Sequence, residues 1–198
     1  MDFSAAERAR RIRLILFDVD GVLTDGKIWT LPLAPANPLE GVAETTFEAK
    51  GFHAQDGAGI SLARIGGIHC GVITKRTSET VAQRARALRL EYVYMGQEYK
   101  IQAVREIMQR GGFTLDQIAY VGDDVIDLPV MRVCGLAIAV ANARDQVKAA
   151  AQYITPNAGG EGAGRDAIDF ILQAHGILDQ CIEEYIDEHN TALAAGQQ

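Results

Sequence analysis

The sequence has few cysteines, no long apolar run and no excess of positive charge, and each shortage argues against a class of protein. Its three cysteines, Cys70, Cys134 and Cys181, lie far apart without CxxC spacing, which argues against a disulfide framework and a zinc site. No apolar run reaches the roughly 18 residues of a membrane span. A net charge of −7 disfavours nucleic acid as a partner. We therefore expect a protein of the reducing cytoplasm, with neither membrane nor nucleic acid as partner.

The length of the chain favours one domain around a single hydrophobic core. Its 198 residues are 48% hydrophobic, and roughly 150 residues is a usual domain size. We expect an N-terminal extension over residues 1–11, the domain over residues 12–180, and a C-terminal tail over residues 181–198 with a disordered end. The arginine-rich start is followed by a short apolar run that ends in acids, which is not the pattern of a signal peptide.

Short apolar strands alternate with amphipathic helices along the domain. The alternation predicts right-handed βαβ crossovers, and hence an α/β fold with a central parallel sheet. The expected strands are Ile12–Phe17, Ile68–Ile73, Tyr92–Tyr94, Ile118–Val121, Leu136–Val140 and Tyr153–Ile154. The expected helices are Ile60–Ile65, Ser78–Leu88, Lys100–Arg110, Leu128–Val133, Ala143–Ala149 and Ala167–His175. Ligands of such sheets bind beyond the carboxyl ends of the strands.

The segment of residues 26–51 interrupts this alternation. Its flanks, 27–31 and 45–48, are predicted to form a β-hairpin, whose connection holds Pro32, Pro35 and Pro38. An isolated two-stranded ribbon cannot bury its own apolar side chains, and exposed apolar surface normally marks an interface. The apolar side chains of this hairpin are Ile28, Trp29, Leu31 and Phe47. We therefore expect a protruding arm through which copies of the chain assemble.

Two carboxylates, Asp18 and Asp20, end the first predicted strand and precede a glycine. Alternation along an extended backbone directs both to the same side, where like charges repel unless a cation or a shared proton compensates them. A carboxylate beside a divalent cation can attack phosphorus while a second protonates the leaving oxygen. We interpret Asp18 as the nucleophile and Asp20 as the general acid and base; the alternative is a pair of solvated acids before a turn.

Two further polar residues stand where this chemistry needs them. Thr74 follows the strand predicted over 68–73, and its hydroxyl could hold a phosphoryl oxygen, although threonine at such a position commonly caps a helix. Lys100 begins a predicted helix, where a buried ammonium would neutralise both the nucleophile and the phosphoryl group. A solvated lysine is the alternative there.

An acidic loop follows the strand predicted over 118–121. Its sequence, Gly122-Asp123-Asp124-Val125-Ile126-Asp127, begins with a glycine that permits close backbone approach. Carboxylate oxygens at the end of a buried strand suit Mg²⁺, with water and phosphate in the remaining positions. A solvated acidic loop is the alternative.

Taken in order, DVDGVLT, a strand that ends in Thr, a Lys and GDDVID resemble the four motifs of the haloacid dehalogenase superfamily of phosphatases. With the segments 52–60 and 159–163 and the hairpin, the chain is similar to the 3-deoxy-D-manno-octulosonate 8-phosphate phosphatase family over about residues 12–180. The resemblance implies a Rossmann-like three-layer sandwich without a cap domain. It further implies hydrolysis of a sugar-acid phosphomonoester through an aspartyl-phosphate, with 3-deoxy-D-manno-octulosonate 8-phosphate as the first candidate substrate.

The same resemblance implies a cofactor, an assembly and a set of site residues. The cofactor is Mg²⁺, and the assembly is a homotetramer in which the hairpins form a barrel and neighbouring subunits help to close each site. The implied metal ligands are Asp18, the main-chain carbonyl of Asp20, and Asp123. The implied catalytic residues are Asp18, Asp20, Thr74 and Lys100. The implied substrate-binding residues are Asp20, His53, Gln55, Asp56, Gly57, Arg76, Arg84 and Lys100.

Four positions depart from the family pattern. Gln55, Ser61 and Glu161 stand where the family has arginine, and Lys75 stands where it has glycine. Arginine would meet the carboxylate or hydroxyls of a keto-sugar acid, and its bidentate recognition is not replaced by Gln or Glu. A related nonulosonate or another sugar phosphate is therefore the alternative substrate.

Two alternatives from other classes are open. A receiver-type signalling domain also uses a phosphoryl aspartate, Mg²⁺, Thr and Lys, but its acidic pair is adjacent and its acceptor Asp ends a later strand, whereas no Asp ends the segment 71–73. A non-catalytic tetramerising module of the same fold would have no physical need for a costly acidic cluster. Turnover of an aryl phosphate separates these alternatives from the phosphatase.

Overall fold

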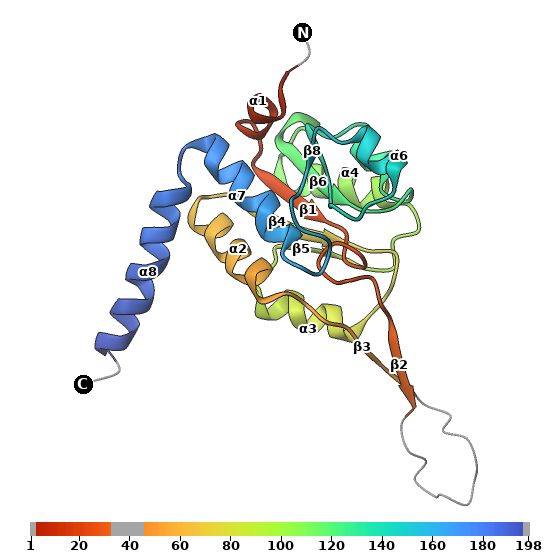
Figure 1. Cartoon of the computed structure of the whole chain (residues 1–198), viewed down its shortest axis with the longest axis horizontal. Helices are drawn as coiled ribbons and strands as arrows, with labels where there is room; N and C mark the ends of the chain where they lie inside the picture. Colours follow the sequence, from red (N-terminus) through yellow and green to blue (C-terminus); the bar gives the residue numbers. More distant parts are fainter. Residues whose placement is uncertain (1–2, 33–45, 196–198) are drawn as a thin grey trace, which may run out of the picture.

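A six-stranded parallel sheet forms the middle of the molecule (Figure 1). The computed structural model describes residues 3–32 and 46–195. The sheet order is β5-β4-β1-β6-β7-β8, and the strands are β1 (Leu14–Phe17), β4 (His69–Ile73), β5 (Tyr92–Tyr94), β6 (Ile118–Gly122), β7 (Leu136–Ala139) and β8 (Tyr153–Ile154). The chain runs outward from β1 to β5 and then crosses to β6 on the other side of β1. The switch between β1 and β6 is where an open α/β sheet binds its ligand.

Helices cover both faces of the sheet. On one face α2 (Ala54–Ile65) packs against α7 (Ala163–His175), which also contacts α1 (Ala5–Ala9) and α8 (Leu178–Ala195). The other face carries α4 (Lys100–Gly111), α5 (Leu128–Met131) and α6 (Asp145–Ala150), in the places that right-handed crossovers require. The remaining helices are α3 (Glu79–Ala87), between β4 and β5, and the 3₁₀ turn η1 (Leu115–Gln117). The α/β fold with a central parallel sheet is confirmed.

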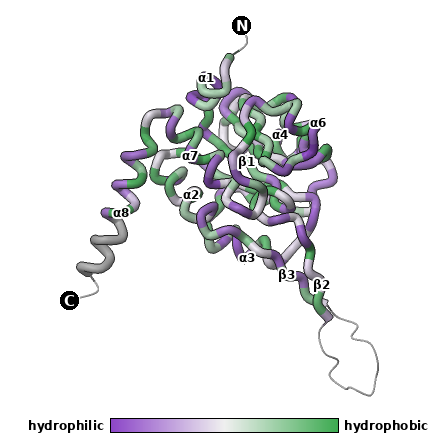
Figure 2. The backbone as a smooth tube through the Cα atoms, in the orientation of Figure 1, coloured by the Kyte–Doolittle hydropathy of each residue, from purple (hydrophilic) through white to green (hydrophobic). Residues whose placement is uncertain are grey.

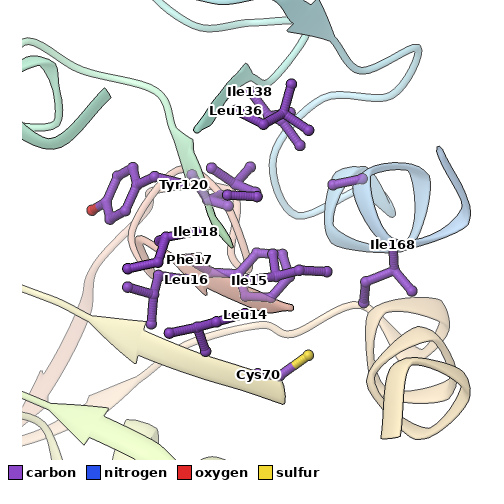
Figure 3. Close-up of a cluster of buried hydrophobic side chains, with 14 of the residues drawn as sticks. Leu14, Ile15, Leu16, Phe17, Cys70, Ile118, Tyr120, Leu136, Ile138 and Ile168 are labelled. Carbon is purple, nitrogen blue, oxygen red and sulfur yellow. The ribbon is translucent and has the colours of Figure 1, made fainter. Parts of the chain in front are cut away.

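The core consists of apolar side chains on both faces of the sheet. All four residues of β1 are fully buried, and Figure 3 shows them beside Ile118 and Tyr120 of β6 and near Ile168 of α7. A strand that is buried on both faces has no polar side, so its sequence is a continuous apolar run. The first residue beyond this run is Asp18, which therefore stands at the edge of the core.

Most predicted elements are confirmed, with differences at their ends. The bounds of β5 and β8 are as predicted, whereas α2 begins at Ala54 rather than Ile60 and α7 at Ala163 rather than Ala167. The start of α2 was missed because glycines weaken the helical pattern in the sequence. In the structure, a Cβ on Gly57 would lie 2.9 Å from the Arg84 guanidinium, so the glycine makes room for that side chain.

Helices form at both ends of the chain. The N-terminal extension forms α1, where Ser4 and Glu7 make a capping box, and Ala9 and Ile12 are fully buried. Helix α8 continues to Ala195, through most of the tail whose end was predicted to be disordered, and residues 196–198 lie outside the described residues. In the described part of the chain, no helix combines the length and the apolar character that crossing a membrane requires.

The predicted hairpin is present and projects from the body of the domain (Figure 1). It consists of β2 (Trp29–Pro32) and β3 (Thr46–Ala49), paired antiparallel with Leu31 opposite Phe47. The placement of Pro32 in the connection is wrong: it is the last residue of β2, at the end of a two-stranded ribbon, where its missing N–H is tolerated. The connection itself, with Pro35 and Pro38, lies outside the described residues.

Candidate active site

The polar residues that follow the strands β1, β4 and β6 meet in one cavity of about 260 Å³ beyond the carboxyl ends of these strands. The cavity is lined by Asp18, Asp20, Thr74, Lys75, Arg76, Asp123, Asp124 and Ile126. Asp18 follows β1, Thr74 follows β4, and Asp123 follows β6. Parallel strands bring their carboxyl ends to one edge, which is why three segments far apart in the sequence converge here.

Lys100 lies directly behind the predicted nucleophile. It is only 3% exposed, and its Nζ is 2.7 Å from Asp18 Oδ1 and 2.7 Å from Asp127 Oδ1. Burial favours the neutral amine, but the carboxylates of Asp18 and Asp127 outweigh it and raise the pKa of Lys100 above its ordinary value. Lys100 is therefore a buried ammonium that compensates the charge of Asp18, and the alternative of a solvated lysine is wrong.

Buried like charges surround the cavity floor. Burial raises the pKa of Asp18 to about 6; the nearby Lys100 lowers it and the nearby Asp127 raises it. Burial, and then the charges of Asp18 and Asp127, raise the pKa of Asp123 to about 7. Three carboxylate oxygens, one each from Asp18, Asp123 and Asp127, lie within 4.8 Å of one another. Such a cluster is costly unless a cation compensates it.

The donor set of this cluster fits a hard divalent cation. Asp123 Oδ1 is buried without a hydrogen-bond partner among the described residues. Both oxygens of Asp127 are already used: Oδ1 accepts from Lys100 and Tyr120, and Oδ2 accepts from the backbone N–H of Asp123 at 3.0 Å and of Asp124 at 3.3 Å. Asp18 and Asp123 are thus the carboxylates with oxygens available to a metal, in the all-oxygen environment that Mg²⁺ prefers.

Thr74 is a cavity residue and not a helix cap. It is 2% exposed, and its hydroxyl accepts the backbone N–H of Arg76 at 3.3 Å. Ser78 caps α3 instead, through the N–H of Val81. The hydroxyl proton of Thr74 is therefore available to an acceptor in the cavity.

The base of the hairpin reaches into the site, a contact that was not predicted from the sequence. The buried ammonium of Lys50 pairs with the carboxylate of Asp20. Glu48 accepts a hydrogen bond from Ser78 at 2.6 Å and pairs with Arg76 at 2.8 Å. The sequence did hold a signal, because the polar residues of 46–50 alternate with apolar ones and therefore share a face.

The other predicted substrate residues lie at the start of α2 and in the last turn of α3, outside the lining of this cavity. Asp56 is 3% exposed, and its Oδ1 accepts the backbone N–H of Arg165 at 2.8 Å in the first turn of α7. Burial raises the pKa of Asp56 to about 6. The side chains of His53 and Gln55 are oriented toward Gly162, since a Cβ there would lie 3.5 Å from His53 Nδ1 and 3.1 Å from Gln55 Oε1. The structure thus gives Asp56 a helix-capping role.

Arg84 and Gly57 form the rest of this second group. The Arg84 guanidinium carbon lies 5.7 Å from the centre of the Phe52 ring and packs against Gly57. Arg84 Nε is buried without a hydrogen-bond partner among the described residues. Contact between these residues and a substrate stays a prediction.

The glycine-rich loop of residues 159–162 holds the segment after β1 in place. A Cβ on Gly159 would lie 1.7 Å from the carbonyl oxygen of Gly21, so no other residue fits there. The N–H of Gly160 donates to the carbonyl of Val22 at 3.1 Å. The loop therefore supports the turn that carries Asp20.

Comparisons with known proteins agree with this geometry. A family model described as haloacid dehalogenase-like hydrolase matches residues 77–164. The 3-deoxy-D-manno-octulosonate 8-phosphate phosphatase KdsC of Escherichia coli K12 is 38% identical over 173 residues, which cover 87% of this chain and 86% of that protein. Such relatedness over most of both chains extends to the whole domain and not to one motif.

Solved structures show the same likeness. The crystal structure of 3-deoxy-D-manno-octulosonate 8-phosphate phosphatase from Yersinia pestis is 36% identical with a TM-score of 0.80, and the match covers 88% of each chain. The enzyme of that name from Moraxella catarrhalis, solved with magnesium, phosphate and KDO, is 35% identical with a TM-score of 0.79, covering 91% of this chain and 97% of that one.

Proposed function

This chain belongs to the 3-deoxy-D-manno-octulosonate 8-phosphate phosphatase family of the haloacid dehalogenase-like hydrolases, and on that premise we propose that it is an Mg²⁺-dependent phosphatase of 3-deoxy-D-manno-octulosonate 8-phosphate. Its product would enter lipopolysaccharide biosynthesis. The observation that carries the proposal is the pairing of Asp18 with the buried ammonium of Lys100, in a cavity that also holds Asp20, Thr74 and Asp123. The receiver-domain alternative is dropped.

In the proposed reaction a carboxylate oxygen of Asp18 attacks phosphorus. The bond from phosphorus to the sugar oxygen breaks, and Asp20 gives that oxygen its proton. Water then attacks the aspartyl-phosphate while its proton passes to Asp20, and the bond from phosphorus to the Asp18 oxygen breaks. Phosphate leaves, Asp18 is again a carboxylate, and Asp20 is again protonated. The Thr74 hydroxyl holds a phosphoryl oxygen, and Lys100 balances the negative charge beside Asp18.

Asp18, Asp123 and the main-chain carbonyl of Asp20 would hold the Mg²⁺. When bound, the ion supplies the positive charge that lets a carboxylate meet an anionic phosphate ester. The other groups of the site are held in place by residues of this chain. Lys50 orients the Asp20 carboxylate, and Asp127 holds both Lys100 and the loop that carries Asp123.

The leaving group would meet the outer part of the cavity. Two cationic side chains, Lys75 and Arg76, line the cavity together with the apolar side chain of Ile126. The two cations suit a substrate with a carboxylate besides its phosphate. Lys75 also pairs with Glu98 at 2.8 Å, an exposed contact that a substrate anion can replace.

We expect phosphate release from 3-deoxy-D-manno-octulosonate 8-phosphate that stops in excess chelator and returns with added Mg²⁺. The assay includes a nonulosonate phosphate, other sugar phosphates and an aryl phosphate. Preference for another sugar acid would replace the substrate but keep the chemistry. Full activity in excess chelator would refute the metal site, and no turnover of any ester would favour the non-catalytic module.

We also propose a homotetramer that assembles through the hairpin. Trp29, Leu31 and Phe47 share one face of the ribbon and are 57%, 41% and 46% exposed. Figure 2 shows hydrophobic residues on this ribbon, away from the body of the domain. The opposite face carries Glu48, which binds the start of α3. A partner on the apolar face would remove it from water and could exclude water from the capless site.

The double substitution Trp29→Ser with Phe47→Ser tests this assembly. We expect smaller species in sedimentation velocity and a raised KM for the sugar-acid phosphate, because the partner surface is lost. Hydrolysis of an aryl phosphate stays detectable, since Asp18 is untouched. Thr30→Ala, on the other face of the ribbon, is the matched control. A wild-type protein that sediments as a monomer at micromolar concentration while fully active would refute the proposal.

A location in the cytoplasm completes the proposal. The three cysteines are free and buried, and burial raises the pKa of both Cys70 and Cys134 to about 12. Unpaired, unreactive thiols are typical of a reducing compartment.

A further inference from the structure

Tyr120 lies beneath the cavity and does not touch it. It belongs to β6, it is fully buried, and Figure 3 shows its ring beside the apolar core with the hydroxyl oxygen at the outer end. The hydroxyl lies 3.1 Å from Lys100 Nζ and 2.8 Å from Asp127 Oδ1. A buried apolar residue would fill the same space without these two contacts.

The direction of each hydrogen bond is fixed by the chemistry of the groups. An ammonium only donates, so the Tyr120 oxygen accepts from Lys100 and its O–H donates to Asp127. With Asp18 and Asp127 at 2.7 Å each, the three protons of the Lys100 ammonium have three acceptors. The ammonium therefore has one orientation, and Tyr120 supplies its only uncharged acceptor among the described residues.

The Tyr120 hydroxyl also constrains the orientation of the Asp127 carboxylate. Its Oδ1 accepts from both Lys100 and Tyr120, while its Oδ2 accepts from the backbone of Asp123 and Asp124. One carboxylate thus joins the lysine behind the nucleophile to the acidic loop. A change in the orientation of Asp127 would displace both Lys100 and the loop that carries Asp123.

We propose that Tyr120 is a positioning residue, whose hydroxyl fixes the Lys100 ammonium against Asp18 through direct contact and through Asp127. The inference rests on the proposed phosphatase function, because it assigns Tyr120 a part in that reaction. Lys100 serves the transition state only where it is held, and displacements of about 1 Å can cost on the order of a hundredfold in rate.

The variant Tyr120→Phe removes the hydroxyl and keeps the ring. We expect kcat to fall about tenfold on both the sugar-acid phosphate and an aryl phosphate, with KM changed by less than about twofold. Tyr92→Phe is the matched control, since it deletes a hydroxyl from another buried tyrosine of the same sheet, and it should leave both constants unchanged. Rates are measured well below the melting temperature of each variant, so that lost stability does not enter them.

A double-mutant cycle with Asp127→Asn and a crystal structure of Tyr120→Phe complete the test. If Tyr120 acts through Asp127, the two substitutions together cost less than the product of their separate effects. The crystal structure should show the Lys100 ammonium displaced from Asp18. An unchanged kcat, or an unmoved Lys100, would overturn the proposal. Failure of the wild type on every phosphate ester would instead refute the proposed function, while the crystal structure would still decide the role of Tyr120.

Discussion

We expect Asp18→Asn to abolish turnover and to leave the fold intact. An amide has nearly the volume of the carboxylate but cannot attack phosphorus, so we expect kcat to fall on the order of a thousandfold or more. Lys100 keeps Asp127 and Tyr120 as partners, which preserves its buried charge pair. Phosphate release from an aryl phosphate and circular dichroism measure the two parts of this result.

Asp25→Asn is the matched control for this substitution. It makes the same change of charge on an exposed carboxylate near the same turn, where Asp25 pairs with Lys27 at 3.0 Å, and it should retain wild-type activity. Acid quenching of the working wild type should trap a phosphoryl group on the peptide that contains Asp18. Substantial turnover by pure Asp18→Asn would eliminate the covalent mechanism.

Substitution of Asp20 should slow the reaction without abolishing it. Asp20→Asn should slow both proton transfers, at the leaving group and at the attacking water.

The sheet could be predicted because its strands are buried on both faces. Continuous apolar runs such as Leu14–Phe17 identify such strands directly. Elements whose residues serve tight packing were harder to find. Gly57 and Gly59 interrupt the helical pattern of α2 because Arg84 and Arg165 lie where their Cβ atoms would be. A sequence shows the weakened pattern but not the neighbour that requires it.

The site was predictable to the extent that its residues stand at strand ends. Asp18, Asp20, Thr74 and Asp123 line one cavity as expected, and Lys100 reaches it from the start of α4. This convergence follows from the topology of a parallel sheet alone.

The residues that hold the site were not assigned roles in advance. Tyr120 lies inside an apolar strand, where its hydroxyl has no visible purpose until Lys100 and Asp127 are placed around it. Lys50 belongs to the hairpin, and its pairing with Asp20 depends on how the hairpin base folds back. Such contacts join segments that have no pattern in common, so spacing in the sequence cannot reveal them.

The carboxylates of the cavity are only partly compensated within the protein, and a bound metal ion would compensate the rest. Lys100 is shared between Asp18 and Asp127, so it cannot also compensate Asp123 in full. Without metal, Asp123 is the carboxylate that remains uncompensated, which agrees with its raised pKa and its unpartnered Oδ1. We therefore expect the Asp123 carboxylate to be needed for activity and yet to lower the stability of the metal-free protein.

Asp123→Asn should lose most activity and yet make the metal-free protein more stable. In the metal-free fold the pKa of Asp123 is raised from 3.8 to about 7, so the folded state holds this proton to a higher pH than the unfolded state does. The resulting stabilisation is present below about pH 4 and is lost as the pH rises through about 7. At pH 8 the uncharged Asn avoids this loss, and we expect a gain of about 1–3 kcal/mol that shrinks toward pH 5.

Thermal unfolding in chelator at pH 8 and pH 5, and again with Mg²⁺, measures these effects. Mg²⁺ should raise the melting temperature of the wild type, because a ligand that binds the folded state stabilises it, but should barely move that of Asp123→Asn. Asp124→Asn removes an exposed carboxylate from the same loop and should be close to wild type in chelator. Equal stabilisation of wild type and Asp123→Asn by Mg²⁺ would show that Asp123 does not hold the ion, and a less stable variant at pH 8 in chelator would show that its charge is compensated within the protein.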